Sequence, residues 1–322
     1  MTTTPDPADL RFPAEALLTE PAVEEVIPVG EDVPVKRRSN SQWADVWRRY
    51  KRNKLAMVGL GVIGVLFVLA VVGQFLAPYD PFEQNLINTL EGPSADHWFG
   101  TDELGRDLFS GLLYGLRLAF IVGLSVMVGS LLIGVTLGAI AGYLGGAMDS
   151  LLMRITDVFL AFPYLIAAII LIRAFDPGRQ HVYPVVIVLV VLAWPTTGRL
   201  MRGQVLAARE AEYVEAARSI GAPGPRIVLR HILPNSIAPV LVYAFTGIGV
   251  AIVSMAGLSF LGIGVPTDEP EWGRMIAAGF KFFQVPGSSY LWVFPSIAIV
   301  ITVLAFAFVA DGLRDSLDPK LR

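Results

Sequence analysis

The sequence predicts an all-α polytopic membrane protein with about six membrane-spanning helices. Three observations lead to this fold class. Of the 322 residues, 54% are hydrophobic and only 16% are charged, whereas a soluble domain carries about 25% charged residues. The mean hydropathy is +0.60. The apolar residues gather in uncharged runs, each compatible with the roughly 20 residues that a helix needs to cross a bilayer.

The N-terminal residues 1–41 differ in composition from the rest of the chain. They are rich in proline and acidic residues, and their apolar residues show no sustained period. Such a composition cannot bury enough apolar surface to hold a fold. No basic region precedes an apolar segment here, so the pattern is not that of a signal peptide. We therefore predict a disordered acidic tail on the cytoplasmic side of a membrane.

The segment 42–54 is basic and aromatic, with Trp47, Arg48 and Arg49 at its centre. Such residues suit the headgroup region of a membrane. The uncharged run Leu55–Ala77 follows and is predicted to be the first membrane span. Because the basic segment precedes this span, the positive-inside rule places the N-terminus in the cytoplasm.

Five further apolar runs complete the predicted set of spans. With the N-terminus inside, the inner loops carry more Lys and Arg than the outer loops, as the positive-inside rule requires. We therefore expect a multi-pass protein of the cell membrane with both termini in the cytoplasm. The runs are Leu116–Gly142, Leu151–Phe175, Pro184–Met201, Ile237–Ile263 and Leu291–Ala310.

A few charged residues lie close to the third predicted span. Asp149, Arg154 and Asp157 lie near its cytoplasmic start. Arg154 and Asp157 are three residues apart, so one helix face can carry both and we expect them to form an ion pair. Arg173 and Asp176 are expected to pair at the outer end. Structural pairing or snorkelling is favoured over substrate contact, because each charge lies near the end of the span.

The sequence offers no pattern of a catalytic, metal-binding or cofactor-binding site. It has no cysteine, and its three histidines are far apart. It also lacks H-E-x-x-H, G-x-x-x-x-G-K-[ST] and G-x-S-x-G, the patterns of zinc hydrolases, nucleotide-binding loops and serine hydrolases. We expect a non-catalytic membrane subunit with no cofactor or metal of its own and no nucleic-acid partner.

The longest polar stretch in the second half of the chain is Glu212–Ile237, EYVEAARSIGAPGPRIVLRHILPNSI. Good helix formers predict a first helix over Arg209–Ile220. Gly221 has the position of a C′ residue that ends this helix. Pro225 suits the first turn of a second helix, which Pro234 should break or kink. The stretch thus predicts two short helices joined by a sharp turn.

This stretch resembles the EAA loop of ABC importer permeases, in which an E-A-A-x-x-x-G segment precedes I-x-L-P. The matching residues are Glu215, Ala216, Ala217, Gly221, Leu233 and Pro234, and His231 stands where the consensus has Ile. In that family the loop lies in the cytoplasm and docks in a groove of the ATP-hydrolysing subunit. The resemblance therefore implies that residues 203–236 form the ATPase-coupling loop.

Three other segments resemble one branch of these permeases, which transports oligopeptides, dipeptides and nickel. The first is HWFGTDELGRDLFSGLLYG, residues 97–115. Its glycines and charged residues are consistent with turns, helix caps and ion pairs, and equally with a role in substrate handling. The second covers residues 258–273, and the third is DGLRDSLDP, residues 311–319. Together with the EAA loop, the resemblance covers nearly all of residues 43–322.

The resemblance implies a type I ABC importer permease fold in residues 55–322. It implies one of two homologous permease subunits, each forming half of the translocation pathway for di- or oligopeptides. The implied partners are the second permease, cytoplasmic ABC ATPase subunits that bind ATP and Mg²⁺, an extracytoplasmic substrate-binding protein and membrane lipid. A nickel-chelate or glutathione-type substrate is the alternative within the family. An ATP-independent secondary transporter is a less favoured alternative. Proteins of that class bury ionisable groups at the membrane midplane and often have interrupted helices in paired repeats, and this sequence shows neither clearly.

Overall fold

The computed structural model describes residues 42–176, 181–266 and 269–317. The predicted tail, residues 1–41, lies outside the described residues, and so do residues 318–322 of the C-terminal motif. The described residues form helices, turns and loops, with one isolated β-bridge between Thr101 and Asp107. The predicted all-α class is confirmed.

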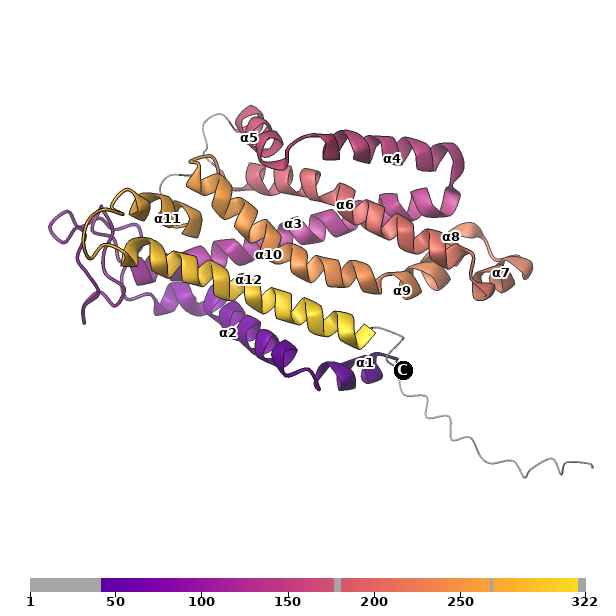
Figure 1. Ribbon diagram of the computed structural model, residues 1–322, viewed down its shortest axis with the longest axis horizontal. Helices are drawn as coiled ribbons and strands as arrows, with labels where there is room; N and C mark the ends of the chain where they lie inside the picture. Colours follow the sequence, from indigo (N-terminus) through magenta and orange to yellow (C-terminus); the bar gives the residue numbers. More distant parts are fainter. Residues whose placement is uncertain (1–41, 177–180, 267–268, 318–322) are drawn as a thin grey trace, which may run out of the picture. The chain divides into compact units, whose positions relative to one another are not determined.

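Five long helices in the described part are long and apolar enough to cross a membrane. They correspond to five of the six predicted spans, and Figure 1 shows them running alongside one another. Their lengths, 23 to 37 residues, meet or exceed what a bilayer requires. The helices are α2 (Lys54–Leu76), α3 (Leu108–Leu144), α6 (Tyr183–Arg209), α10 (Ala238–Phe260) and α12 (Tyr290–Leu317).

The third predicted span is not one continuous helix. It consists of α4 (Gly146–Ala161) and α5 (Tyr164–Phe175), which meet at an angle of 92° (Figure 1). Pro163 stands at the N-cap of α5. A proline lacks the N–H of a helical hydrogen bond and disfavours helical geometry at the preceding residue, here Phe162. The third predicted span is therefore a bent pair of helices, either one broken span or a re-entrant segment.

Helix α3 is the element against which most of the others pack. It lies along α6 and also contacts α2, α4 and α10. Gly138 allows the closest approach, since a Cβ there would lie 2.3 Å from the carbonyl oxygen of Gly198 on α6. A buried hydrogen bond of 2.8 Å joins Ser130 Oγ on α3 to Thr197 Oγ1 on α6. Small residues thus bring these two helices together, as is common in membrane proteins.

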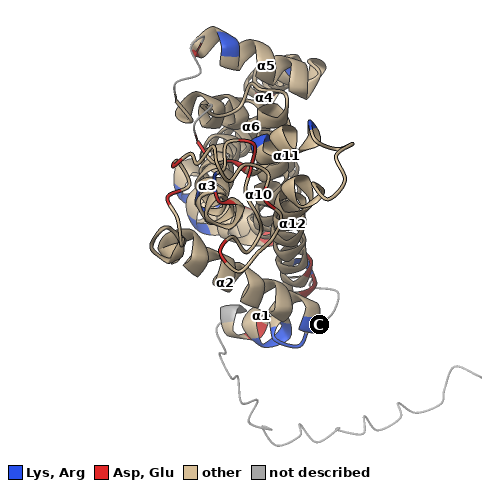
Figure 2. Ribbon diagram, turned by 90° about the vertical axis from the view of Figure 1, so that its left-hand side faces the viewer, with Lys and Arg blue, Asp and Glu red and all other residues tan. Residues whose placement is uncertain are grey.

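Apolar side chains also cover much of the outer surface of the helices. On α2, Val65, Phe67 and Phe75 are exposed, which a lipid environment explains better than water does. Figure 2 shows the complementary pattern, with most charged residues in loops and at helix ends. Both observations are in keeping with a multi-pass membrane protein.

Shorter helices connect or flank the long ones. Helix α1 precedes α2 and packs against α12, where Tyr50 contacts the same apolar cluster as Val309. Between α6 and α10 lie three short α-helices and one π-helix, η3, and α11 lies between α10 and α12. Their bounds are α1 (Gln42–Tyr50), α7 (Glu212–Ser219), α8 (Gly224–Ile227), η3 (Val228–Ile232), α9 (Leu233–Ser236) and α11 (Trp272–Phe280).

Candidate functional site

The segment between α6 and α10 folds as the predicted pair of short helices, but its first helix begins later than expected. Helix α6 continues to Arg209, and α7 begins at Glu212 after Ala211 adopts an extended conformation. Arg209 is the last residue of α6, and its guanidinium donates to the carbonyl oxygen of Gly142, at 3.2 Å, near the end of α3. The predicted helix over Arg209–Ile220 is therefore corrected to Glu212–Ser219.

Gly221 ends α7 in the predicted way. Its φ is +80°, a left-handed conformation that glycine adopts without a Cβ penalty. The N–H of Gly221 donates to Arg218 O at 3.0 Å, and the N–H of Ala222 donates to Ala217 O at 3.1 Å. This pair of bonds is a Schellman motif. The turn after α7 is thus fixed by the backbone itself.

The second helix begins as predicted and is distorted rather than ended by its later proline. Pro225 lies in the first turn of α8. The chain then widens into η3 before Pro234 enters the first turn of α9. A π-turn accommodates a proline ring because the ring would clash with a carbonyl in a regular α-helix. We predicted that Pro234 breaks or kinks the second helix. Because α8, η3 and α9 follow one another without a gap, the helix is kinked and not broken.

The segment has one buried face and one exposed face. Val214, Ala217, Ile227 and Ile232 are buried, in a cluster that also contains Met201 and Val205 of α6 and Ala139 of α3. Leu233 packs at the edge of this cluster. The segment is therefore anchored on the two helices at the centre of the bundle.

The exposed face carries the remaining residues of the EAA pattern. Glu215, Ala216, Gly221 and Pro234 are exposed. Gly221 faces open space, since a Cβ there would meet nothing of this chain within 4 Å. The structure thus divides the six predicted residues, with Ala217 and Leu233 turned toward the bundle and the other four left accessible.

Two apolar residues of this face were missed by the sequence reasoning. Ile220 is 85% exposed and Leu229 is 67% exposed. Apolar side chains that protrude from a polar loop are typical of contact surfaces. The sequence could have indicated them, because both are apolar residues within the polar stretch. Neither is among the buried residues of the segment.

Ion pairs join α4 to α6, the helix that leads into this segment. Arg202 Nη2 lies 2.6 Å from Asp149 Oδ2, and the same guanidinium contacts the other carboxylate oxygen through Nε. Arg199 pairs with Asp157. The predicted pair of Arg154 with Asp157 was wrong, because Asp157 turns to a neighbouring helix instead. No group of three or more His, Asp or Glu side chains in the described part of the chain could hold a metal ion.

Asp176, at the outer end of the third predicted span, contacts the backbone of His181. Its carboxylate accepts a hydrogen bond of 3.1 Å from the backbone N–H of His181. This contact joins the end of α5 to the start of the segment that leads into α6. The prediction that Asp176 pairs with Arg173 therefore stays a prediction.

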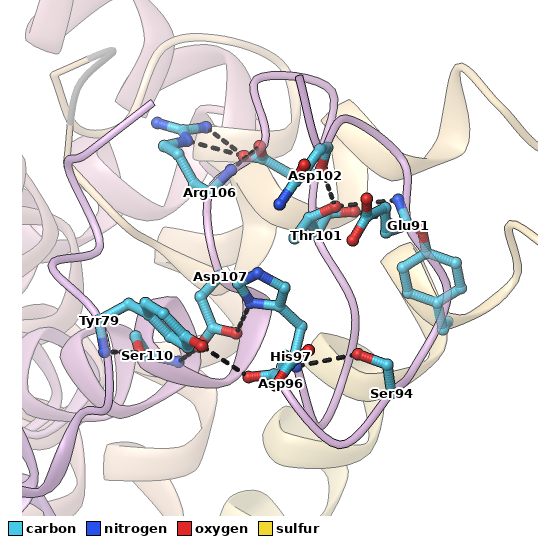
Figure 3. Close-up of polar contacts among 12 residues, drawn as sticks. Tyr79, Glu91, Ser94, Asp96, His97, Thr101, Asp102, Arg106, Asp107 and Ser110 are labelled. Carbon is cyan, nitrogen blue, oxygen red and sulfur yellow. Dashed lines mark hydrogen bonds and ion pairs between the residues drawn. The ribbon is translucent and has the colours of Figure 1, made fainter. Parts of the chain in front are cut away.

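The loop between α2 and α3 is held by its own charged residues, as Figure 3 shows. Asp102 accepts from the backbone N–H groups of Leu104 and Arg106, at 2.8 and 2.9 Å, and pairs with the Arg106 guanidinium at 2.7 Å. Asp107 caps α3 by accepting from Ser110 N at 2.7 Å, and it contacts His97 Nδ1 at 2.9 Å. The structural interpretation of residues 97–115, as turns, caps and ion pairs, is confirmed.

A pocket of about 260 Å³ lies where this loop meets α11. Its lining includes Asp102 and Arg106 of the loop, Ser259 at the end of α10, and Glu271 and Arg274 at the start of α11. Two of the three segments that resembled the peptide branch, residues 97–115 and 258–273, therefore contribute to one cavity. Sequence reasoning did not single out Glu271 as a candidate, since nothing local distinguishes it from a helix cap.

The comparisons with known proteins agree with this architecture. Residues 134–322 match a family model described as the inner membrane component of binding-protein-dependent transport systems. The chain belongs to this family. Residues 41–93 match a second model, the N-terminal transmembrane domain of oligopeptide transport permease C. As a member of this family the chain is an ABC transporter permease, and its apolar helices make it a multi-pass membrane protein.

Several curated relatives of this permease are similar over most of their length. The dipeptide transport system permease protein DppC of Alkalihalophilus pseudofirmus is 42% identical, over 88% of this chain and 91% of the relative. The oligopeptide transport system permease protein OppC of Bacillus subtilis is 39% identical, over 91% and 94%. The glutathione transport system permease protein GsiD of Pectobacterium atrosepticum is 40% identical, over 92% and 96%.

Proposed function

We propose that this permease is one of the two membrane subunits of an ABC importer and forms half of a pathway for di- or oligopeptides. The relatives named for dipeptide and oligopeptide transport support the substrate class. The observation that carries the coupling role is the two-faced segment Glu212–Ser236, with one face anchored on α3 and α6 and the other exposed.

The exposed face suits a docking surface for an ATPase subunit. Ala216 has a small side chain, which allows a partner to approach closely, and Glu215 offers a negative charge to a basic partner. Ile220 and Leu229 protrude and would lose their contact with water in a complex, at about 25 cal/mol per Å² of apolar area. Because Val214, Ala217 and Ile227 are packed on the bundle, a movement of the docked partner would be passed to α6.

The proposed complex contains four kinds of component besides lipid. These are this chain, a second homologous permease, ATPase subunits or domains, and an extracytoplasmic binding protein. ATP and Mg²⁺ would be bound by the ATPase partners, since this chain has no nucleotide-binding loop pattern. Both termini and the docking face would lie in the cytoplasm, with the basic residues of α1 at the lipid headgroups.

A glutathione-type substrate is the second candidate. The relative GsiD, named for glutathione transport, is as similar to this chain as the peptide permeases are. Since glutathione is itself a small peptide, the two candidates differ in substrate and not in mechanism. Uptake assays with each substrate would separate them.

The deciding experiment is uptake by the complete importer in proteoliposomes. We expect import of labelled peptide to require internal ATP and the external binding protein, and to continue when the proton gradient is collapsed. Uptake that persists without ATP but stops with the proton gradient would identify a secondary transporter instead. The ATPase-free permease pair serves as the negative control.

A further inference from the structure

Helices α5, α6 and α10 contact one another, and the face that they leave uncovered carries several hydroxyl groups. We call four of these residues the hydroxyl strip: Tyr164 at the start of α5, Thr196 on α6, and Tyr243 and Ser254 on α10. Tyr164 and Thr196 are exposed, and Tyr243 and Ser254 are half-buried. Polar side chains therefore reach the surface of this chain within its membrane-spanning part.

The strip runs along the spans rather than around them. Thr196 lies thirteen residues from each end of α6, which is about 20 Å at 1.5 Å per residue, so it lies deep within the membrane. Ser254 lies six residues before the end of α10, which is the outer end in the proposed orientation, and Tyr243 lies five residues after the start of that helix. The hydroxyl groups therefore follow the direction in which a substrate crosses the membrane.

The surface of α2 differs from this face in its chemistry. The exposed side chains of α2 include several valines and phenylalanines, and the helix has no serine, threonine or tyrosine over its whole length. Contact with hydrocarbon explains such a surface. The same contact does not explain why exposed hydroxyl groups gather where α5, α6 and α10 meet.

A charged pair and two glycines lie beside the strip. Arg199, one turn after Thr196 on α6, pairs with Asp157 of α4, and their side chains are 44% and 52% exposed. Charged side chains in membrane spans face protein or water rather than lipid. Gly203 and Gly257 continue the same faces of α6 and α10, and a Cβ on either would meet nothing within 4 Å among the described residues. The surroundings of the strip are therefore polar and leave room beside both helices.

The hydroxyl groups are paired within the chain and still keep hydrogen-bonding capacity. The side chains of Tyr164 and Ser254 are hydrogen-bonded to each other, and so are those of Tyr243 and Thr196. A hydroxyl offers one donor and two lone pairs, so a bonded pair retains one O–H donor and further lone pairs. A peptide amide needs an acceptor for its N–H and a donor for its C=O. The strip can therefore bind amides, and its internal bonds keep it satisfied when no substrate is present.

We propose that the hydroxyl strip lines the peptide route and forms hydrogen bonds with the backbone amides of the passing substrate. This inference rests on the proposed function, and it states which part of the substrate this chain contacts. All peptides share the same backbone amides, whereas their side chains differ, so a wall of uncharged hydroxyl groups accepts peptides of different sequence. A hydrogen bond between neutral groups has a small net free energy, so the substrate can also leave the wall.

The first test measures whether water reaches the strip in the complete importer. Thr196→Cys and Ser254→Cys each place one thiol on the strip, and Val68→Cys replaces a valine of α2 that is 58% exposed. This chain has no cysteine of its own, so labelling is read on its band after electrophoresis. We expect a charged, water-soluble thiol reagent to label the two strip positions and not Val68→Cys, which a lipid-soluble maleimide should label.

Two labelling results would overturn the proposal. Reaction of both strip positions with the lipid-soluble maleimide alone would show that the strip faces lipid. Reaction with neither reagent in the complete importer would show that the sister subunit covers the strip. Either result would leave the importer assignment intact.

The second test asks whether a peptide passes the strip. Radiolabelled alanyl-cysteinyl-alanine is supplied as its pyridyl disulfide, so that an introduced thiolate attacks the peptide sulfur, forms a mixed disulfide and releases pyridinethiol. We expect Thr196→Cys to capture this peptide only with ATP and binding protein present, and excess trialanine to reduce the capture severalfold. Ile87→Cys, in the loop between α2 and α3, should react without ATP as well. Uptake of the peptide without capture at Thr196→Cys or Ser254→Cys would overturn the proposal.

The third test removes the hydroxyl groups and keeps the shape of the side chains. Thr196→Val and Tyr243→Phe should each lower trialanine uptake about fivefold, the scale of one lost hydrogen bond. Thr302→Val is the control, since the Thr302 hydroxyl is buried and donates to the carbonyl oxygen of Ala298 in its own helix. Uptake is divided by the amount of assembled importer, because each strip variant also loses a bond within the chain. Normal uptake by both strip variants would overturn the proposal.

The outcomes for this inference and for the proposed function are distinguishable. A strip that is dry, or that captures no peptide, in an importer whose wild type imports trialanine with ATP would overturn the inference alone. ATP-independent uptake by the wild type would instead refute the proposed function, whatever the labelling of the strip.

Discussion

Asp149 and Arg202 join α4 to α6 through a two-point ion pair, with Arg202 Nη2 2.6 Å from Asp149 Oδ2. Arg202 lies on the last turns of α6, the helix that leads into the exposed segment Glu212–Ser236. The pair is partly buried, with side-chain exposures of 17% for Asp149 and 31% for Arg202. A displacement of α6 must therefore either carry α4 with it or break these bonds.

The first prediction concerns this ion pair. Arg202→Ala should lower the stability of the permease by about 2 kcal/mol, the scale of a hydrogen bond to a charged group, and should reduce peptide uptake more than ATP hydrolysis. Thermal unfolding and the ratio of peptide imported to ATP hydrolysed would measure the two effects.

One control for this prediction comes from α4, the helix that carries Asp149, and another from exchanging the two charges. Arg154→Ala removes an exposed arginine of α4 and should leave the ratio unchanged. Exchanging the charges, with Asp149→Arg and Arg202→Asp together, should recover part of the loss. If Arg202→Ala and Arg154→Ala behave alike, the pair does not transmit movement.

The second prediction concerns the exposed face of the coupling segment. Gly221→Val should impose a backbone penalty of ~1–2 kcal/mol at its positive φ and place a branched side chain toward the partner. Glu215→Lys should reverse the charge of the face. Both variants should insert normally but bind the ATPase more weakly, which co-purification and substrate-stimulated hydrolysis would measure.

The chain offers a matched control for each of these variants. Gly287 has a φ of +85° and, like Gly221, open space around it, but it lies between α11 and α12 and not in the proposed docking segment, so Gly287→Val isolates the backbone penalty. Glu83→Lys reverses an exposed charge in the loop between α2 and α3. If the coupling variants hold the ATPase as tightly as these controls do, the segment is not the docking surface.

The third prediction concerns topology. The chain has no cysteine, so single cysteines can be labelled without background. Ile87 and Ile220 are 92% and 85% exposed, so Ile87→Cys and Ile220→Cys are comparably accessible probes. We expect an impermeant reagent to label Ile87→Cys from outside and Ile220→Cys from inside only, with the ATPase protecting the latter. Labelling of Ile87→Cys from the inside alone would reverse the proposed orientation.

The fourth prediction concerns the acidic N-terminal residues. Their composition cannot support a core, so deletion of residues 1–32 should leave assembly and transport largely intact. The basic segment 42–54 remains in this variant and continues to set the orientation. Normal expression combined with lost uptake would show that the tail acts directly.

The sequence predicted the features that depend on local chemistry. Five apolar runs became long helices, and Gly221 ended α7 as its position required. Pro163 within the third run indicated a possible bend. The mean hydropathy of the run does not show it, because one proline changes that average very little. Local reasoning therefore located the elements but did not give the bend within the third one.

Features that depend on distant parts of the chain could not be predicted in the same way. Asp157 pairs with Arg199, 42 residues away, although Arg154 offered a partner on the same helix. Likewise, Ser259 and Glu271 come to line one pocket only when α10, α11 and the loop between α2 and α3 are assembled. A single sequence does not reveal which charges on different helices will meet.

The bend between α4 and α5 makes the surface formed by these two helices different from the surface formed by α2. Sixteen residues of α4 and twelve of α5 extend about 24 and 18 Å at 1.5 Å per residue, so neither alone crosses a hydrocarbon layer of about 30 Å. Hydrocarbon cannot satisfy the backbone groups that a break leaves open, whereas protein or water can. We therefore expect the flank of α4 and α5 to face the sister subunit or a hydrated route, while α2, with its exposed valines and phenylalanines, faces the lipid chains.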